Sequence, residues 1–499
     1  MSDSPHYASQ TLRRLLSLGL GLGLAMLLLA GCTLLAPPRP DPLAAYRPAL
    51  SPAFSLPPVQ MNAIPVYSIT VRIDPPAQAY TGSLDLTLPV SNTPISQLYF
   101  RLFPNLRQLD GSLEVSNARL DGISVNYAYT TSHSAVHLSL PAPVVPGKIA
   151  LIHLDFTGKF SRHSDEAYTL FGISEDVLSL ANFYPILAPR RESQWVLDIP
   201  DPQGDIGFFD SAFYQVTVVA PVGQVLVSSG SATGARMAGP GLVTYHYVQG
   251  PGREFMLLLS PRWQVEEVNT YGTHVRSYFF PEDADAGRTA LFDAASALQV
   301  YSDHFGPYPY REMSVVESPI TFRGQEFPGL NLIGSQAYST FLKDLENRVA
   351  HEVGHQWWYN QVGSDQIDAP WQDEGLTEFS TYFYYADRYG PPVGDSLRRS
   401  RWVTPVGLVA GTPRDMPIGR SVPEYNQGNY ETMIYAKGAL FFATLRDEMG
   451  PDAFDRFLRA YLQRYRWQIA RPEDLQALAS EVSGRDLTAL FNQWLNGIQ

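Results

Sequence analysis

The residues with the clearest chemical potential lie in one short segment, His351-Glu352-Val353-Gly354-His355. On a helix, positions i and i+4 project from one face about one turn apart, so the two imidazoles can converge on one cation. A tetrahedral catalytic zinc takes three protein ligands and keeps one position open for water. Glu352 would lie beside that water as a general base. The segment therefore predicts a hydrolytic zinc site.

A third ligand is available after eighteen intervening residues. Glu374 lies in the segment Trp371-Gln372-Asp373-Glu374-Gly375, and the loop before it contains Gly363 and Pro370, which could return a second helix to the first. Glu378 follows on the same helical face, where it could hydrogen-bond the other ring nitrogen of a ligand histidine and fix its orientation. The alternative interpretation is two amphipathic helices with surface carboxylates. We expect one zinc ion per chain, held by His351, His355 and Glu374.

These residues resemble the zinc signature of the gluzincin aminopeptidases, the family of aminopeptidase N and leukotriene hydrolase. The signature is H-E-x-x-H, eighteen residues, then E, and it is matched in full by His351, Glu352, His355 and Glu374. The resemblance extends over residues 62–499 and includes the segments Phe305–Pro309 and Gln356–Asn360. It implies a zinc peptidase whose first domain is a saddle-shaped β-sheet and whose second domain is thermolysin-like.

The family also has a tyrosine, in a Y-x-K-G context, that stabilises the tetrahedral intermediate. Tyr435-Ala436-Lys437-Gly438 fits this context, and the chain has few other lysines. A phenol can donate a hydrogen bond to a developing oxyanion, which is the electrostatic stabilisation that acyl transfer needs. The resemblance therefore implies a catalytic role for Tyr435, and the alternative is one more buried tyrosine.

The exopeptidase motif of the family departs from its usual form. That motif is G-x-M-E-N, whose glutamate binds the free amine of the substrate, and Glu326 aligns with it in Gly324-Gln325-Glu326-Phe327. Glutamine replaces the methionine and phenylalanine replaces the asparagine. The resemblance implies that Glu326 binds the substrate amine, and the alternative is a loop carboxylate without substrate contact.

These residues together predict a zinc-dependent aminopeptidase that hydrolyses the N-terminal peptide bond of peptides. Two alternatives remain. One is a zinc endopeptidase of the same fold, and the other is a catalytically inactive scaffold that binds a partner. Inactive scaffolds usually lose a ligand or the base, whereas His351, Glu352, His355 and Glu374 are all present.

The elements that must position these residues fall into two blocks, which predict an α+β fold. Apolar and polar residues alternate in many short runs up to about residue 270, which is typical of an antiparallel β-domain, assigned to 62–272. A mostly α-helical catalytic domain is assigned to 273–499. Its predicted helices are 338–361, 372–389, 434–448, 451–465, 472–482 and 486–495.

The N-terminal segment predicts export and a lipid anchor. Arg13 and Arg14 precede an uncharged run that is too short to span a bilayer, so residues 1–31 are predicted to be a signal peptide. The run ends Leu29-Ala30-Gly31-Cys32, which resembles the bacterial lipoprotein box, and Cys32 is the only cysteine of the chain. We expect an extracytoplasmic, membrane-anchored lipoprotein, and the alternative is an ordinary signal peptide. The proline-rich residues 32–61 are predicted to be an extended tether that does not pack.

The net charge of the chain limits the classes of partner that it can bind. The formal net charge of the 499-residue chain is −13, so it repels phosphate backbones, and nucleic acid is not an expected partner. The one basic cluster, Arg398, Arg399 and Arg401, is predicted to be a solvated helix face. The expected partners are peptide substrates and a membrane reached through the lipid anchor. Many relatives add a large helical domain that encloses the site, and since this chain ends at Gln499, a more open site is expected.

Overall fold

The computed structural model describes residues 41–163, 170–191, 194–320, 324–426 and 428–497. The chain divides into two units, Met1–Ala45 and Tyr46–Gln499, and the elements below lie in the second unit. The predicted signal peptide (1–31) and Cys32 lie outside the described residues. Among the described residues, no helix has the length and apolar character needed to cross a membrane.

The predicted tether is shorter than expected, because its second half packs against the folded chain. Tyr46, Leu50 and Phe54 are buried, although prolines surround them. Leu50 forms an isolated backbone bridge with Tyr310, and the ring of Tyr46 lies 4.4 Å from that of Phe213. Burial of these apolar side chains offsets the extended preference of the prolines. A short helix, α2 (Pro58–Met61), follows.

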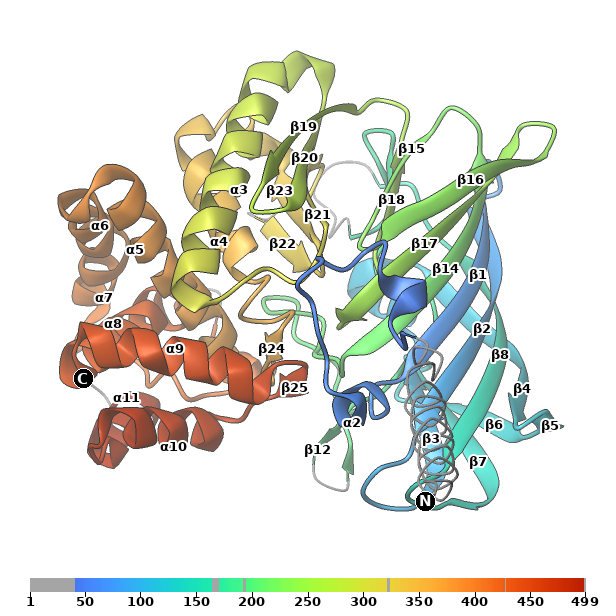
Figure 1. Ribbon diagram of the computed structural model, residues 1–499, viewed down its shortest axis with the longest axis horizontal. Helices are drawn as coiled ribbons and strands as arrows, with labels where there is room; N and C mark the ends of the chain where they lie inside the picture. Colours follow the sequence, from blue (N-terminus) through green and yellow to red (C-terminus); the bar gives the residue numbers. More distant parts are fainter. Residues whose placement is uncertain (1–40, 164–169, 192–193, 321–323, 427, 498–499) are drawn as a thin grey trace, which may run out of the picture. The chain divides into compact units, whose positions relative to one another are not determined.

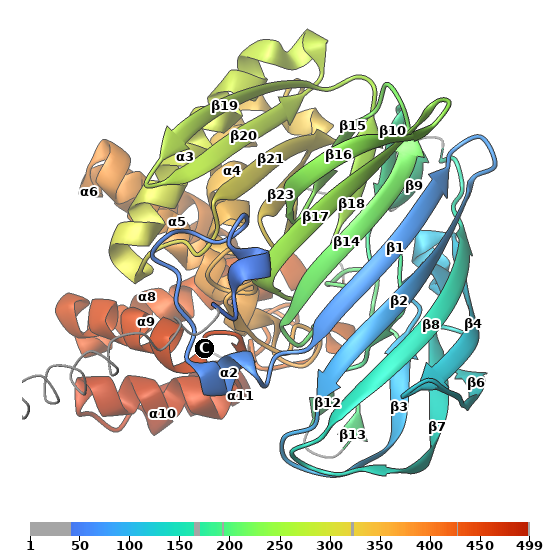
Figure 2. The same ribbon diagram turned by 45° about the vertical axis from the view of Figure 1, so that its right-hand side comes forward.

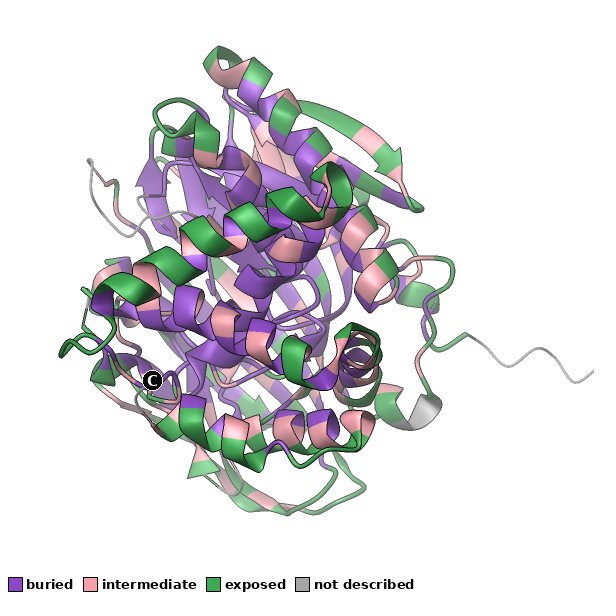
Figure 3. Cartoon of the chain, turned by 90° about the vertical axis from the view of Figure 1, so that its left-hand side faces the viewer, coloured by how far each residue is buried: buried purple, intermediate pink, exposed green. Residues whose placement is uncertain are grey.

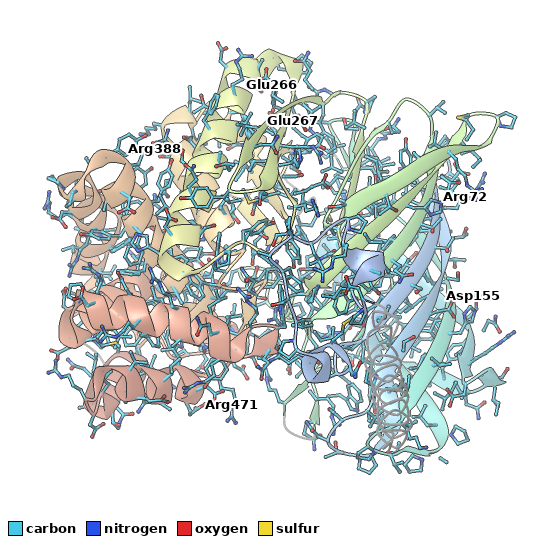
Figure 4. All side chains as sticks on the ribbon, viewed as in Figure 1. Arg72, Asp155, Glu266, Glu267, Arg388 and Arg471 are labelled. Carbon is cyan, nitrogen blue, oxygen red and sulfur yellow. The ribbon has the colours of Figure 1, made fainter. Side chains whose placement is uncertain are left out.

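An eight-stranded sheet forms the first part of the unit. Its order is β16-β17-β14-β1-β2-β8-β4-β5. The strands are β1 (Val66–Asp74), β2 (Ala79–Pro89), β4 (Ser112–Leu120), β5 (Ile123–Ser124), β8 (Ile149–Lys159), β14 (Ala212–Pro221), β16 (Ser231–Gly239) and β17 (Leu242–Gly252). Figure 2 shows the long strands from β17 to β8 running side by side. The alternation seen in the sequence places one face of each long strand in the core, whereas charged residues such as Arg72 on β1 and Asp155 on β8 lie outside (Figure 4).

The prediction of an antiparallel β-domain is confirmed except at one pair. β1 and β14 are parallel, although every other pair in this sheet is antiparallel. These two strands are separated by more than a hundred residues, so the crossover that makes them parallel leaves no local signal. Two four-stranded sheets complete this part. One contains β9 (Phe171–Ser174), β10 (Val177–Leu180), β15 (Val225–Ser228) and β18 (Leu257–Ser260), and the other contains β3 (Ile95–Arg101), β6 (Asn126–Thr130), β7 (Ala135–Val144) and β11 (Ile186–Leu187).

A five-stranded mixed sheet opens the second part. Its order is β19-β20-β21-β23-β22, so β22 is an edge strand. The strands are β19 (Gln264–Thr270), β20 (Thr273–Phe279), β21 (Glu312–Ser318), β22 (Gly324–Phe327) and β23 (Leu330–Gly334). The predicted domain boundary at 272/273 falls in the turn between β19 and β20, and both of these strands belong to this sheet. The change of architecture therefore comes before β19.

Helices form most of the remaining chain (Figure 1). They are α3 (Ala284–Phe305), α4 (Leu345–Gly354), α5 (Leu376–Tyr389), α6 (Pro391–Leu397), α7 (Thr404–Val409), α8 (Gly438–Met449), α9 (Pro451–Tyr465), α10 (Pro472–Ser483) and α11 (Thr488–Asn496). Their outward faces are exposed and their inward faces buried (Figure 3), which explains the helical spacing of apolar residues. Three π-helical stretches, Trp371–Gly375, Arg398–Val403 and Thr432–Lys437, continue directly into α5, α7 and α8.

One predicted helix is much shorter in the structure. The sequence favoured a helix over 338–361, whereas α4 covers Leu345–Gly354. The chain turns away after His355, because Nδ1 of this side chain lies 3.0 Å from the carbonyl oxygen of Trp358 and Tyr359 adopts a φ of 138°. The ends of the other predicted helices agree to within a few residues.

A buried arginine joins the two parts of the unit. Arg253 follows β17 and is 1% exposed. Its guanidinium donates to the carbonyl oxygens of Tyr359 (2.7 Å), Phe209 (2.9 Å) and Gln468 (2.8 Å). Since buried carbonyl groups need partners, this one side chain fastens the chain just beyond α4 to the strands of the first part. The acceptor Gln468 belongs to β25 (Gln468–Ile469), which pairs with β24 (Val362–Gly363), and a further two-stranded pair is β12 (Arg190–Arg191) with β13 (Gln194–Trp195).

Candidate metal and substrate site

The structure brings the three predicted zinc ligands together. His351 and His355 lie on α4 and its C-terminal end, and their Nε2 atoms are 3.2 Å apart. Glu374, in the π-helical stretch Trp371–Gly375, places Oε2 3.1 Å from Nε2 of His351 and 3.4 Å from Nε2 of His355. All three side chains are buried, and their ligand atoms lie within 4.8 Å of one another. This donor set of two imidazoles and one carboxylate suits a catalytic zinc site.

Glu378 lies where the sequence predicted it. Its Oε2 is 3.1 Å from Nδ1 of His351, so it orients the ring and directs Nε2 toward the metal position. Its Oε1 accepts hydrogen bonds from Nε of Arg401 and from Nε1 of Trp402, each at 2.9 Å. Burial opposes ionisation of Glu378, but Arg401 and His351 outweigh it and lower the pKa to about 2.

The basic cluster is only partly the solvated face that the sequence predicted. Arg398 lies 3.4 Å from Asp447, both partly exposed, and Arg399 is exposed. Arg401 instead turns inward to Glu378. The prediction is wrong for Arg401 because its buried partner is 23 positions away, which no local pattern reveals.

Asp373 is a site residue that sequence reasoning missed. Its Oδ1 lies 2.8 Å from Nδ1 of His355, so consecutive residues contact both nitrogens of one imidazole, Asp373 at Nδ1 and Glu374 at Nε2. Both residues lie in the π-helical stretch Trp371–Gly375, whose wider turn allows neighbours to point toward the same ring. The sequence contained one signal for this role, because Asp373 is an acidic residue directly before the predicted ligand Glu374.

A second group, Glu326, His355 and Asp373, also has ligand atoms within 4.8 Å of one another. Because Nδ1 of His355 already contacts Asp373 and a backbone carbonyl, its Nε2 is the nitrogen left for a metal. That atom faces His351 and Glu374, so the first group is the metal position.

Glu352 lies beside the metal position, as a general base requires. It is buried, and burial raises its pKa to about 7, although His351 and His355 act in the opposite direction. A Cβ atom added to Gly324 would overlap Oε1 of Glu352. The glycine at the start of β22 therefore makes room for the carboxylate of Glu352.

Tyr435 also faces the metal ligands. Its hydroxyl donates to Oε1 of Glu374 at 2.6 Å. The stretch that carries it is anchored two residues later, where Nζ of Lys437 lies 2.7 Å from Asp415 in a fully buried ion pair. Gly375 and Gly438 also approach so closely that an added Cβ on either would lie 3.0 Å from the other's backbone. This contact brings the Tyr435 stretch against the Glu374 stretch.

Glu326 lies on the edge strand β22 and is buried next to the metal site. Its Oε2 accepts a hydrogen bond from Nε2 of Gln325 (2.8 Å), and its Oε1 accepts one from Nε2 of Gln366 (3.3 Å). The same two amides donate to Asp205, at 3.1 Å and 2.9 Å. Two carboxylates are thus held side by side by neutral amide donors.

Asp205 is a second residue that the sequence did not reveal. It comes from the loop before β14, so the first part of the unit contributes directly to the site. Burial, together with Glu374 and Asp373, raises its pKa to about 8. Burial also raises the pKa of Glu326 well above its usual range, with His355 opposing. No spacing relates Asp205 to the zinc ligands, because it lies on a different part of the fold.

These residues line one cavity of about 470 Å³. Most of the lining residues have polar or charged side chains, and they come from both parts of the unit. They are Pro202, Gln203, Gly204, Asp205, Gly324, Gln325, Glu326, Asn347, Arg348, His351, Glu352, His355, Glu374, Glu378, Arg401, Tyr430, Glu431 and Tyr435.

Comparison with known proteins gives a consistent family. Residues 290–494 match the profile of the peptidase family M1 domain. This stretch therefore forms a peptidase family M1 domain. Relatives include aminopeptidase M1-C of Oryza sativa subsp. japonica, 25% identical over 302 residues, which are 57% of this chain and 34% of that protein. Another is the alanine/arginine aminopeptidase of Saccharomyces cerevisiae, 26% identical over 247 residues, which are 46% of this chain and 28% of that protein.

The chain spans about a third of the length of these curated relatives. Among solved structures, the M1 zinc metallopeptidase of Deinococcus radiodurans has a TM-score of 0.67 and 21% identity, over 88% of this chain and 94% of that one. This likeness confirms the predicted fold class, in which a strand-rich N-terminal part precedes a helical C-terminal part.

The cofactor of family M1 is zinc, and the residues present fit one ion. The carboxylates around the two imidazoles favour positive charge at this position. Burial lowers the pKa of His351, but Glu374 and Glu378 outweigh it and raise the pKa to about 9. A dication would satisfy Glu374 and both Nε2 atoms together, since all three already point to one place.

We expect one zinc ion per purified chain and its loss in Glu374→Ala, because only two imidazole ligands would remain. Glu378→Ala should keep zinc but weaken its affinity by about 10–100-fold, since the ring of His351 loses its orienting partner. Elemental analysis and chelator competition measure both effects. Glu431→Ala removes a lining carboxylate outside the ligand set and serves as the matched control. Active wild-type protein without a transition metal would contradict the assignment.

Proposed function

We propose that the protein is a zinc-dependent aminopeptidase that hydrolyses the N-terminal peptide bond of peptides. The observation that carries this proposal is the position of Glu326. Its carboxylate is buried beside the metal position, with ligand atoms within 4.8 Å of those of His355 and Asp373, and it accepts hydrogen bonds from the neutral amides of Gln325 and Gln366. A carboxylate in this environment is stabilised by a cation, and the free ammonium group of a peptide supplies one.

The residues around the cavity would each have a different role in the hydrolysis. Zinc, when bound, polarises the scissile carbonyl and makes a water molecule more acidic. The carboxylate of Glu352 accepts a proton from the attacking water and returns it to the leaving amine. The hydroxyl of Tyr435 donates to the oxygen that becomes negative in the transition state. Glu378 and Asp373 hold the two histidine rings in place.

The position of Glu326 also selects which bond is cut. With its ammonium group held at Glu326 and Asp205, a substrate presents its first peptide bond to the metal and to Glu352. The edge strand β22 is not paired on its outer side within the described residues, so its backbone can pair with an extended peptide. The substrate then runs back along β22 from Glu326 toward Gly324.

Blocking the substrate amine tests the exopeptidase assignment. Wild-type enzyme should cleave a free-amine peptide about 10–100-fold faster, in kcat/KM, than its acetylated twin, because acetylation removes the charged contact. Glu326→Ala should slow the free-amine substrate and narrow this gap. Glu424→Ala, an exposed glutamate, is the control. Equal rates on both substrates in wild-type enzyme would instead indicate an endopeptidase.

Tyr435→Phe tests the oxyanion contact. This change removes one hydroxyl and keeps the ring, so kcat should fall by about 100- to 1,000-fold while KM stays nearly constant. Steady-state kinetics on a free-amine peptide, with zinc content measured in parallel, provide the readout. A raised KM with normal kcat would make Tyr435 a substrate-binding residue.

We further propose that the protein is an extracytoplasmic lipoprotein, anchored to a membrane through Cys32. The support is the sequence alone: two arginines, a short uncharged run, and a single cysteine at the end of Leu29-Ala30-Gly31-Cys32. Residues 33–45 would connect this anchor to the unit of the chain that begins at Tyr46.

Lipidation can be measured directly on protein extracted from membranes. Mass spectrometry of the mature N-terminus should find acylated Cys32, and the protein should partition into detergent. Cys32→Ser should leave an unacylated form in the aqueous phase. Wild-type protein with an unmodified cysteine at this position would end the proposal.

A further inference from the structure

A second cavity is separate from the one that the metal ligands line. Its volume is about 760 Å³, and none of its described lining residues lines the metal-site cavity. Its walls come from α2, the start of β1, the end of β2, the segment before β14 and β25, so both parts of the unit contribute. Figure 1 shows where β25 approaches α2, and residues of both line this cavity. The chemistry proposed above uses none of these residues.

One carboxylate in this cavity has no partner among the described residues. Asp210 lies just before β14 and is exposed within the cavity lining, and its carboxylate makes no hydrogen bond or ion pair with a described residue. The surrounding protein desolvates this carboxylate and raises its pKa, whereas the charge of Arg253 acts in the opposite direction. A cationic group of a ligand would therefore stabilise the ionised form of Asp210.

One guanidinium in the same cavity also has no partner among the described residues. Arg466 lies between α9 and β25, lines the cavity, and makes no hydrogen bond or ion pair with a described residue through its guanidinium. Burial lowers the pKa of Arg466, with Tyr310 opposing, but a guanidinium stays charged at neutral pH. Its planar fork of N–H donors suits a carboxylate, which can accept two parallel hydrogen bonds from it.

The segments that carry these two charged groups meet at Arg253. One of its nitrogens donates to the carbonyl oxygen of Phe209, directly before Asp210, and another donates to that of Gln468, two residues after Arg466. The carboxylate and the guanidinium do not form an ion pair with each other. The cavity therefore contains one negative and one positive group, and each can bind an opposite charge.

Buried polar atoms around the cavity also lack partners. Oγ of Ser211 and Nε1 of Trp467 have no hydrogen-bond partner among the described residues, and these two residues are 4% and 7% exposed. Nε of Arg466 is buried and unpaired as well. Trp467 adopts a φ of 65°, and such strained residues are concentrated at binding and catalytic sites. Because buried polar groups normally have partners, a polar ligand would satisfy a region that the protein leaves unsatisfied.

We propose that this cavity binds a free α-amino acid or a short peptide, with its ammonium group at Asp210 and its carboxylate at Arg466. Such a molecule has both charges at once, and a cavity that holds both opposite charges recognises it. Apolar residues of the wall, such as Ile64 and Phe209, contact its side chain. The inference goes beyond the proposed function and does not depend on it, because neither zinc nor the catalytic residues take part in this binding.

Three probes that differ only in charge test the inference. L-phenylalanine has both charges, its amide lacks the carboxylate, and its N-acetyl form lacks the ammonium group. Calorimetric titrations use the full-length Glu326→Ala protein, in which the amine contact of the metal-site cavity is removed. L-phenylalanine should bind, and each modified probe should bind about 10–100-fold more weakly, because a charge-assisted contact is lost.

Variants in the same background assign each contact. Arg466→Gln should make the amino acid and its amide bind equally, and Asp210→Asn should do the same for the amino acid and its acetylated form. Binding at the metal site would not respond to either change, since neither residue lines that cavity. Arg466→Lys keeps a positive charge and should keep part of the preference for the acid, so a lost contact is distinguished from a lost fold.

Arg456→Gln and Asp452→Asn, which change exposed residues of α9 outside the cavity, are the matched controls and should keep full discrimination. Absence of binding, equal binding of the three probes, or unchanged discrimination in the Asp210 and Arg466 variants would overturn the inference. Failure of the aminopeptidase assignment looks different, since acetylated and free-amine peptides would then be cleaved alike.

Discussion

The site depends on one constraint: it buries more carboxylates than cationic side chains. Glu326, Glu352, Asp373, Glu374 and Glu378 are all at most 5% exposed, and they surround two imidazoles and one arginine. Buried carboxylates are costly unless a cation or hydrogen-bond donors compensate them. The fold provides part of this compensation through Arg401 and the side-chain amides. A metal ion between the two imidazoles and Glu374 would supply more of it. Burial, together with the charge that is still uncompensated, raises the pKa of Glu326 and of Glu352.

Much of the site could be predicted because its spacing is local. His351, Glu352 and His355 need only one turn of helix, and Glu374 and Glu378 need only a second helix that returns to the first. The helical assignment sufficed even though α4 is short and Glu374 lies in a π-helical stretch, since both conformations keep the ligands on one face. Tyr435 and Glu326 could be found from the resemblance to a family, and their contacts with Glu374 and the amides are consistent with it.

What the sequence could not provide depends on long-range contacts. Asp205 reaches the site from a loop of the first part, and Arg401 turns inward because its buried partner Glu378 lies on another helix. The parallel pairing of β1 with β14 and the packing of Leu50 have the same origin. In each case the local sequence gives no sign of the contact, because the position of the residue is determined by a partner far away in the chain. Periodicity identifies elements, but it does not say which of them meet.

Arg253 has a consequence for how this protein can change in evolution. Two of its carbonyl acceptors, those of Tyr359 and Gln468, belong to the segment just beyond the metal helix and to the strand that pairs with that segment, whereas the arginine itself belongs to the first part of the fold. Asp205 also links the two parts. It belongs to the first part, and it places a carboxylate in the cavity that the metal ligands line. The first part therefore contributes both a structural residue, Arg253, and a cavity residue, Asp205, to the second part. A genetic exchange that joined one part to an unrelated neighbour would break both the Arg253 contacts and the contribution of Asp205. The two parts should therefore be inherited together, rather than the helical part alone.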